Sequence, residues 1–195
     1  MDAVIGDLSR WPPAERAIIR RVVYASGDPA LAERVRVHPE AIAGGIAALR
    51  AGCPIVVDVR MLEVALDRGS LRRLGCRVAC AIDRESVTRK AHALGLPRAV
   101  VAMRTLAASM NGGVVSVGTA PTALLAVLDL VDAGAVRPAL IVGTPVGFVA
   151  AAEAKAELVS RPVPFITIEG ERGGAALAAT LVNELLRRAI FHDEE

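Results

Sequence analysis

The chain has 195 residues, 53% hydrophobic and only 3% aromatic, and its 23 basic side chains nearly balance 21 acidic ones. This near-neutral charge, with few rings for base stacking, argues against a nucleic-acid partner, and no apolar run reaches the roughly 18 uncharged residues of a membrane span. The first residues lack the positive start and apolar core of a secretion signal, so we expect a cytoplasmic protein without a membrane partner.

Two helices are predicted in the first quarter of the chain. Proline is favoured at a helix start because no N–H is needed there, and Pro12 begins a helical pattern that continues to Ala25. A loop follows around Gly27–Pro29, and a second helix is predicted over Pro39–Ala51. The basic residues of the first helix are interpreted as its solvated face; they are Arg16, Arg20 and Arg21.

Strand signals begin after the second helix. Pro54–Asp58 and Cys76–Ile82 are short apolar runs with an acid at or just after the end, as expected of buried strands. Glu85–Leu94 has a helical pattern that stops at Gly95, the usual residue after a helix end. Another helix is predicted over Arg98–Met110.

Two strand-turn-helix units follow, and they predict the position of a ligand site. The strand Val114–Val117 continues into the turn and helix start Gly118–Leu124, and Leu140–Val142 continues into Gly143–Val149. Unbroken apolar runs are typical of buried parallel strands, and ligands bind at the carboxyl ends of such strands. We therefore expect the two turns to lie side by side and to form one pocket.

The remaining elements are a strand at Pro164–Ile168 and a helix at Gly174–Arg188. Strands that alternate with helices predict an α/β fold, with a mainly parallel sheet covered by helices on both faces. We expect a single domain over residues 1–195, with residues 189–195 as a frayed polar tail.

Several common sites are absent from the sequence. There is no Walker-type phosphate loop, and Gly170–Gly174 does not fit the dinucleotide fingerprint. A nucleotide or sugar-phosphate enzyme on such a sheet would therefore rest on fold analogy alone. No Gly-x-Ser-x-Gly elbow supports a serine hydrolase.

No metal site is expected either. The three histidines are far apart in sequence, and the three cysteines lack a zinc-binding spacing, so we interpret the cysteines as reduced structural thiols. These residues are His38, His92 and His192, and Cys53, Cys76 and Cys80.

Longer motifs resemble one family. Gly118–Leu124 and Pro145–Lys155 are similar to the two signature stretches of precorrin-8X methylmutase, also called cobalt-precorrin-8 methylmutase. Ala47–Asp58 and Gly170–Gly174 extend the resemblance, which covers the chain from about Asp7 to Leu186.

The resemblance implies an isomerase of cobalamin biosynthesis. Such an enzyme moves a methyl group from C11 to C12 of a tetrapyrrole substrate, either precorrin-8X or cobalt-precorrin-8, without a cofactor. The family fold is a parallel α/β sheet that works as a homodimer with active sites near the subunit interface. The reaction calls for an acid that protonates the macrocycle and for cationic groups that hold its carboxylates.

The acid position departs from the family pattern. The family's catalytic histidine lies in Arg-x-Val-His-Ala-x-Gly, and the corresponding stretch here is Arg21–Gly27, which places Tyr24 at the acid position. A phenol donates a proton or hydrogen bond but does not gain a positive charge as imidazole does. His38, beyond one loop, is a second candidate acid. A non-catalytic corrinoid-binding relative is the alternative function.

The resemblance also implies substrate-binding residues. Arg98 matches the family's active-site arginine, where a guanidinium can hold a carboxylate. Thr119 and Thr122 offer hydroxyl and backbone donors at a helix start, or simply cap it. Asp58 is a weaker candidate, because a carboxylate at a strand end commonly serves only as a cap. Turn and wall residues complete the predicted site; they are Gly147, Phe148, Arg172 and Gly173.

Overall fold

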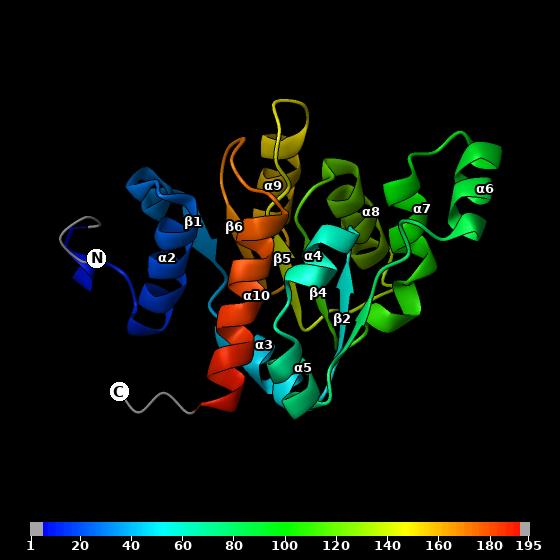
Figure 1. Cartoon of the computed structure of the whole chain (residues 1–195). Coiled ribbons are helices and arrows are strands. Elements are labelled where there is room, and N and C mark those ends of the chain that lie inside the picture. Colours follow the sequence, from blue (N-terminus) through cyan, green and yellow to red (C-terminus); the bar gives the residue numbers. More distant parts are fainter. Residues whose placement is uncertain (1–5, 192–195) are drawn as a thin grey trace.

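A single six-stranded sheet forms the centre of the protein (Figure 1). The structure is a computed structural model that describes residues 6–191. The spatial order of the strands is β1-β6-β5-β4-β2-β3. Their bounds are β1 Val35–Val37, β2 Pro54–Val57, β3 Arg77–Ala79, β4 Val114–Val117, β5 Leu140–Gly143 and β6 Phe165–Ile168.

The sheet is parallel except at one edge, which confirms the predicted mainly parallel arrangement. Every residue of β4, β5 and β6 is buried, as expected for strands covered on both faces. Strand β1 pairs antiparallel with β6, with Val35 opposite Ile168. This strand was not predicted, because three residues of the form Val-Arg-Val are too short to give a periodic signal.

Helices cover both faces, as predicted. On the face shown at the front of Figure 1, α10 packs on α2, α3, α4 and α5. These helices are α2 Pro13–Ser26, α3 Ala41–Arg50, α4 Arg60–Ala65, α5 Arg68–Leu74 and α10 Ala175–Ile190. The opposite face carries α6 Glu85–Leu94, α7 Arg98–Thr105, α8 Pro121–Asp132 and α9 Ala151–Val159. Three short 3₁₀ helices complete the described chain; they are η1 Leu8–Arg10, η2 Pro29–Arg34 and η3 Ala107–Met110.

Each face of the sheet has its own apolar core. Strand alternation divides the side chains of β2: Ile55 and Val57 belong to the core under α10, whereas Val56 belongs to the core under α7 and α8. Leu181 and Leu185 of α10 are fully buried in the first core, and Leu124 and Leu128 of α8 are fully buried in the second. The low aromatic content is therefore matched by cores built mainly from aliphatic side chains.

Several predicted boundaries were wrong. The helix predicted over Arg98–Met110 is divided into α7 and η3, and the strand predicted over Cys76–Ile82 is only Arg77–Ala79. Helices α4 and α5 were not predicted, although Asp67 caps α5 by accepting a hydrogen bond from the Ser70 N–H at 2.6 Å.

The C-terminal tail begins later than predicted. Helix α10 continues through Ile190, because Ala189 is buried and its carbonyl accepts a hydrogen bond from Arg50 Nε at 2.9 Å. The rest of the predicted tail, residues 192–195, lies outside the described residues. Within the described part of the chain, no helix has the length and apolar character needed to cross a membrane.

Candidate active site

A buried carboxylate joins two strands at the carboxyl edge of the sheet. Asp58 follows β2 and is only 1% exposed. Its side chain accepts hydrogen bonds from the backbone N–H groups of Gly118 at 3.1 Å, Thr119 at 2.8 Å and Ala120 at 3.1 Å. Burial raises the pKa of Asp58, and the three N–H donors oppose that rise. The carboxylate therefore occupies the N-terminal end of α8.

This arrangement changes the role expected of the turn before α8. The Thr119 N–H was predicted to bind a substrate carboxylate, but it already donates to Asp58. The Thr119 hydroxyl is buried and has no hydrogen-bond partner among the described residues. Thr122 lies half-buried in the first turn of α8. We therefore assign the backbone of this turn to folding and leave the two hydroxyl groups as substrate-binding candidates.

The two predicted turns do lie side by side, since β4 and β5 are neighbours. The segment that leads into α10 packs closely against both turns. A Cβ atom added to Gly173 would lie 2.2 Å from the Thr144 carbonyl oxygen, and one added to Gly118 would lie 2.7 Å from Ala175 Cα. Gly173 is thus needed for close backbone packing. The pocket between the turns stays a prediction.

A buried lysine holds the glycine-rich loop in place. Lys155 of α9 is fully buried, and its Nζ donates a hydrogen bond to the Arg172 carbonyl oxygen at 2.7 Å. Burial lowers the pKa of Lys155 to about 8, partly opposed by the nearby Glu171. Lys155 is the last residue of the second signature stretch, and no role was predicted for it. The sequence does contain a sign of its burial, because Lys155 shares the apolar face of α9 with Ala151, Ala154 and Leu158.

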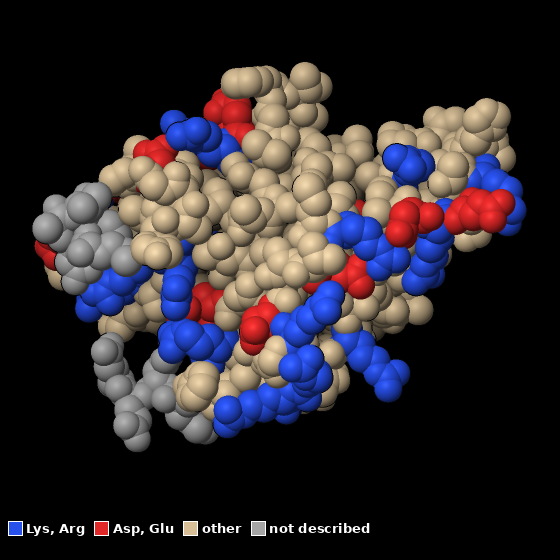
Figure 2. Space-filling view, viewed as in Figure 1, with Lys and Arg blue, Asp and Glu red and all other residues tan. Residues whose placement is uncertain are grey.

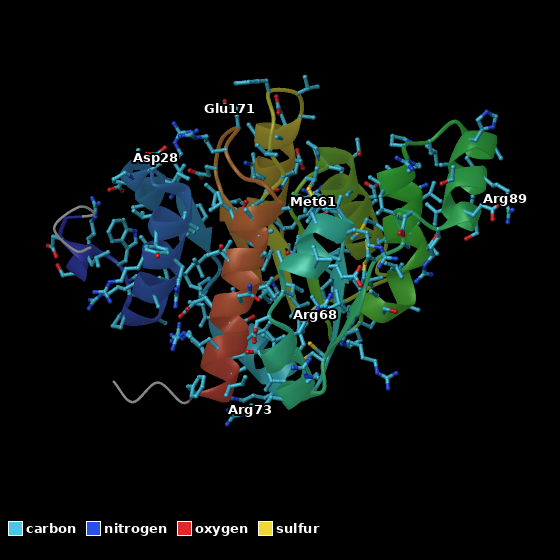
Figure 3. The ribbon with its side chains drawn as sticks, in the orientation of Figure 1. Asp28, Met61, Arg68, Arg73, Arg89 and Glu171 are labelled. Atoms are coloured by element: carbon cyan, nitrogen blue, oxygen red, sulfur yellow. The ribbon has the colours of Figure 1, made fainter. Side chains whose placement is uncertain are left out.

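The Arg172 side chain points toward the N-terminal helices. Its guanidinium forms an ion pair with Asp28 at 2.5 Å, and the arginine side chain is 62% exposed. Figure 3 shows Asp28 near the top of the N-terminal segment and Glu171 at the tip of the loop before α10. Arg172 therefore lies at the carboxyl edge of the sheet, where the pair with Asp28 ties this loop to η2.

We expect the Lys155→Met variant to differ from the wild type in a pH-dependent way. The folded-state pKa is below that of an unfolded lysine, near 10.4, so the unfolded chain binds more protons between about pH 8 and pH 10. The free energy of unfolding of the wild type therefore rises with pH in this window, by about 1–3 kcal/mol relative to Lys155→Met. Melting temperatures of both proteins between pH 7 and pH 10 measure this change.

The other lysine of the chain provides a matched control. Lys90 is exposed on α6, so Lys90→Met controls for the loss of one lysine without the loss of a buried contact. A difference between Lys155→Met and the wild type that does not change with pH would contradict the lowered pKa of Lys155.

The loop between β5 and α9 projects from the carboxyl edge of the sheet (Figure 1). Phe148 at its tip is 96% exposed. The Gly147 N–H donates to the Glu171 carbonyl oxygen at 3.0 Å, and Ala150 has a left-handed backbone with φ of 61°. These contacts fix the base of the loop, and its apolar tip is available for a flat ligand or a protein surface.

Tyr24 lies beside a pocket rich in guanidinium groups. It belongs to the last turn of α2 and is 69% exposed. Two adjoining pockets, of about 360 and 390 Å³, share Tyr24 and lie between α2 and α10. Other lining residues common to both are Arg21, Glu184 and Arg187. The second pocket extends to Asp67 and Ser70 at the start of α5.

The floor of this pocket is a buried ion cluster. The Glu184 side chain is 1% exposed and accepts a hydrogen bond from Arg21 Nε at 2.9 Å. It also accepts hydrogen bonds from Arg187 Nε at 3.1 Å and Nη2 at 2.7 Å. A buried carboxylate holds both guanidinium groups in fixed orientations beside the phenol. Sequence reasoning missed Glu184, because a glutamate near the end of a helix is normally a solvated residue.

His38 lies at the amino edge of the sheet and lines a different pocket from Tyr24. Because β1 runs antiparallel, it carries the chain from the carboxyl edge to the amino edge, where the His38 N–H donates to the Phe165 carbonyl oxygen at 2.9 Å. The His38 ring packs edge-on against Phe165 with centroids 5.7 Å apart. The structure does not bring His38 and Tyr24 together, which argues against His38 as a replacement acid within one chain.

Arg98 is also separated from Tyr24. It is the first residue of α7 and is exposed. Helix α7 packs between α6 and α8 on the face of the sheet opposite α2 and α10 (Figure 1). One chain therefore presents Tyr24 and Arg98 on different faces. Within residues 6–191, no group of three or more histidine, cysteine or acidic side chains is placed to hold a metal ion.

Comparison with known proteins identifies the family of this chain. Residues 2–188 match the family model of CbiC, precorrin-8X methylmutase. The chain belongs to the precorrin-8X methylmutase family. This result confirms the resemblance predicted from the motifs, and it extends over nearly the whole chain.

Individual methylmutases are similar over most of their length. Precorrin-8X methylmutase of Pseudomonas aeruginosa is 44% identical over 167 residues, which cover 85% of this chain and 80% of that protein. Cobalt-precorrin-8 methylmutase of Priestia megaterium is 38% identical over 168 residues, covering 86% of this chain and 75% of that protein. The crystal structure of precorrin-8x methyl mutase from Thermus thermophilus has a TM-score of 0.90 and 35% identity, and the match covers 96% of this chain and 90% of that one.

Proposed function

We propose that this protein is the isomerase that moves a methyl group from C11 to C12 of precorrin-8X, or of cobalt-precorrin-8, in cobalamin biosynthesis. The family match over residues 2–188 is the observation that supports this type of reaction. Tyr24 stands at the acid position beside a pocket lined by guanidinium groups, which suits a macrocycle edged with carboxylates. The methyl shift is intramolecular, so the reaction needs no cofactor or second substrate. We also propose that the protein is located in the cytoplasm.

Tyr24 is assigned as the proton donor. Its phenol donates to the macrocycle while the bond from C11 to the methyl carbon breaks and the bond to C12 forms, and the proton returns afterwards. Atoms and electrons therefore balance within the substrate and one side chain. Exposure of Tyr24 at the pocket mouth leaves its hydroxyl accessible to a bound ring.

Arg21 is assigned to bind a substrate carboxylate. Its Nε contacts Glu184, and its terminal nitrogens can then meet a carboxylate in the pocket. Because the buried Glu184 fixes the orientation of Arg21 and Arg187 before binding, less side-chain entropy is lost when the substrate arrives. Glu184 acts through these arginines and is a positioning residue.

We further propose that the protein works as a homodimer in which a second copy supplies Arg98. Tyr24 and Arg98 lie on opposite faces of one chain, so only a partner brings them together. The surface over α4 and the upper part of α10 carries few charged side chains in Figure 2. Met61 and Val64 of α4 are 62% and 64% exposed, and Figure 3 shows Met61 at this surface. An apolar surface next to the Tyr24 pocket suits a subunit contact.

Mixing two inactive variants tests this shared site. We expect Tyr24→Phe and Arg98→Ala each to lose most activity alone. If each site takes Tyr24 from one chain and Arg98 from the other, random exchange makes hybrid dimers with one intact site, and the mixture recovers about one quarter of wild-type activity. Turnover of the refolded mixture measures this recovery, with each variant refolded alone as the control. Activity no higher than the sum of the separate variants would contradict the shared site.

The visible absorption spectrum tests the reaction itself. The conjugated system changes when the methyl group moves, so precorrin-8X and cobalt-precorrin-8 should each be incubated with purified protein and followed over time. We expect conversion of at least one of them to the C12-methylated product. A substrate spectrum that persists while the pigment co-elutes with the protein would instead identify a corrinoid-binding relative.

A further inference from the structure

Two buried cysteines lie side by side at the amino edge of the sheet. Cys53 directly precedes β2 and Cys76 directly precedes β3, and these parallel strands pair with Pro54 opposite Arg77. Residues in register on neighbouring strands are about 4.8 Å apart and point to the same face. Both cysteines are 8% exposed and belong to the core under α10.

Contacts around the pair show that the two chain segments touch. The Cys76 thiol donates a hydrogen bond at 3.3 Å to the carbonyl oxygen of Leu49, in the last turn of α3 shortly before Cys53. A Cβ atom added to Gly52 would lie 3.2 Å from the Leu74 carbonyl oxygen. The two segments therefore approach closely just before the cysteines, and the pairing of Pro54 with Arg77 holds them together just after.

Cys80 is excluded as a partner for Cys76. It lies four residues further along the same extended segment, at the carboxyl end of β3. At about 3.3 Å per residue, that separation is roughly 13 Å, well beyond the reach of a disulfide.

We propose that Cys53 and Cys76 are a disulfide-forming pair that reacts with low-molecular-weight disulfides such as oxidised glutathione. Their strand register places the Cα atoms within the range of about 4.4–6.8 Å that a disulfide requires. The Cys53 thiolate attacks one sulfur of the reagent and releases one thiol. The Cys76 thiol then loses its proton, attacks Cys53 Sγ and releases the second thiol. Two protein thiols are oxidised and one reagent disulfide is reduced to two thiols.

The surroundings assign the order of these steps. The Cys76 thiol donates its single proton to the Leu49 carbonyl oxygen, which favours the neutral form of this thiol. The adjacent Cys76 lowers the pKa of Cys53. Cys53 is therefore the attacking thiolate and Cys76 the resolving thiol.

Oxidation would close a covalent ring around part of the site. The segment between the two cysteines contains β2, Asp58, α4 and α5. In a reducing compartment the pair remains a dithiol and responds to oxidant. The inference does not depend on the proposed reaction, because neither cysteine is a lining residue of the two Tyr24 pockets.

Peptide mapping of the whole protein tests the pair directly. Wild-type protein is equilibrated with excess oxidised glutathione, unfolded in N-ethylmaleimide and digested. We expect a Cys53–Cys76 linked peptide and alkylated Cys80, with the same link in Cys80→Ala and no link in Cys53→Ser or Cys76→Ser. Full alkylation of both thiols, glutathione retained on Cys53, or a link to Cys80 would each overturn the proposal.

A thermal measurement gives a second readout in the wild-type protein. Because the link restricts the unfolded chain, oxidation should raise the melting temperature by about 5–10 °C, and a reducing agent should reverse the change. The Cys76→Ser variant controls for other effects of the oxidant. An equal shift in that variant would contradict the assignment.

Discussion

Tyr24→Phe is expected to lower the rate of methyl transfer by about 10²- to 10⁴-fold, the usual contribution of a positioned proton donor. The change removes the hydroxyl and keeps the ring, so substrate binding should change much less than the rate. Single-turnover kinetics with bound substrate separate the two effects. Because Tyr24 is 69% exposed, the free energy of unfolding should stay within about 0.5 kcal/mol of the wild type.

Tyr24→His is the informative companion variant. It installs the side chain that the family resemblance places at this position, and imidazole can accept and donate a proton with a change of charge. We expect a rate equal to or above that of the wild type. An unchanged rate in Tyr24→Phe would show that another group supplies the proton. If neither variant changes the rate of turnover, Tyr24 has no part in the mechanism.

Asp58→Ala is expected to cause the largest loss of stability. The substitution leaves three backbone N–H groups, those of residues 118, 119 and 120, without their carboxylate acceptor, one in a buried and two in a partly buried position. Each unsatisfied buried donor costs about 1–3 kcal/mol, so we expect the free energy of unfolding to fall by at least about 3 kcal/mol. Urea titration of the purified variant measures the loss.

Asp58→Asn provides the control for this prediction. The amide keeps one oxygen acceptor and replaces the other oxygen with a donor that faces N–H groups, so its loss should lie between those of the wild type and Asp58→Ala. Equal stability of all three proteins would show that water or a rearranged turn satisfies these donors. In that case Asp58 would not be the group that orders the start of α8.

The sheet and its order of elements were largely predictable, because buried parallel strands and their following helices leave local patterns. The apolar runs that became β4 and β5 ended in the turns predicted for them. Strand β1 and helices α4 and α5 are too short for such patterns, and they form because tertiary contacts hold them. Proline, glycine and acidic residues marked most boundaries correctly, since capping is also local.

The site was less predictable because its contacts join distant parts of the chain. Asp58 reaches Gly118 across 60 residues, and Arg21 reaches Glu184 across 163. No local pattern distinguishes Glu184 from a solvated residue, since its burial depends on helix packing that is set elsewhere. The family resemblance supplied Tyr24 and Arg98, but only the coordinates reveal that these residues lie on opposite faces of one chain.

Isotope labelling of the migrating methyl group tests the central claim most directly. Substrate carrying ¹³C in its C11 methyl group is incubated with the wild-type protein, and the methyl resonance is followed by NMR. We predict that the labelled signal moves from the C11 position to the C12 position with the label fully retained, as an intramolecular shift requires. A label that stays at C11 while the pigment is bound would contradict the methylmutase assignment.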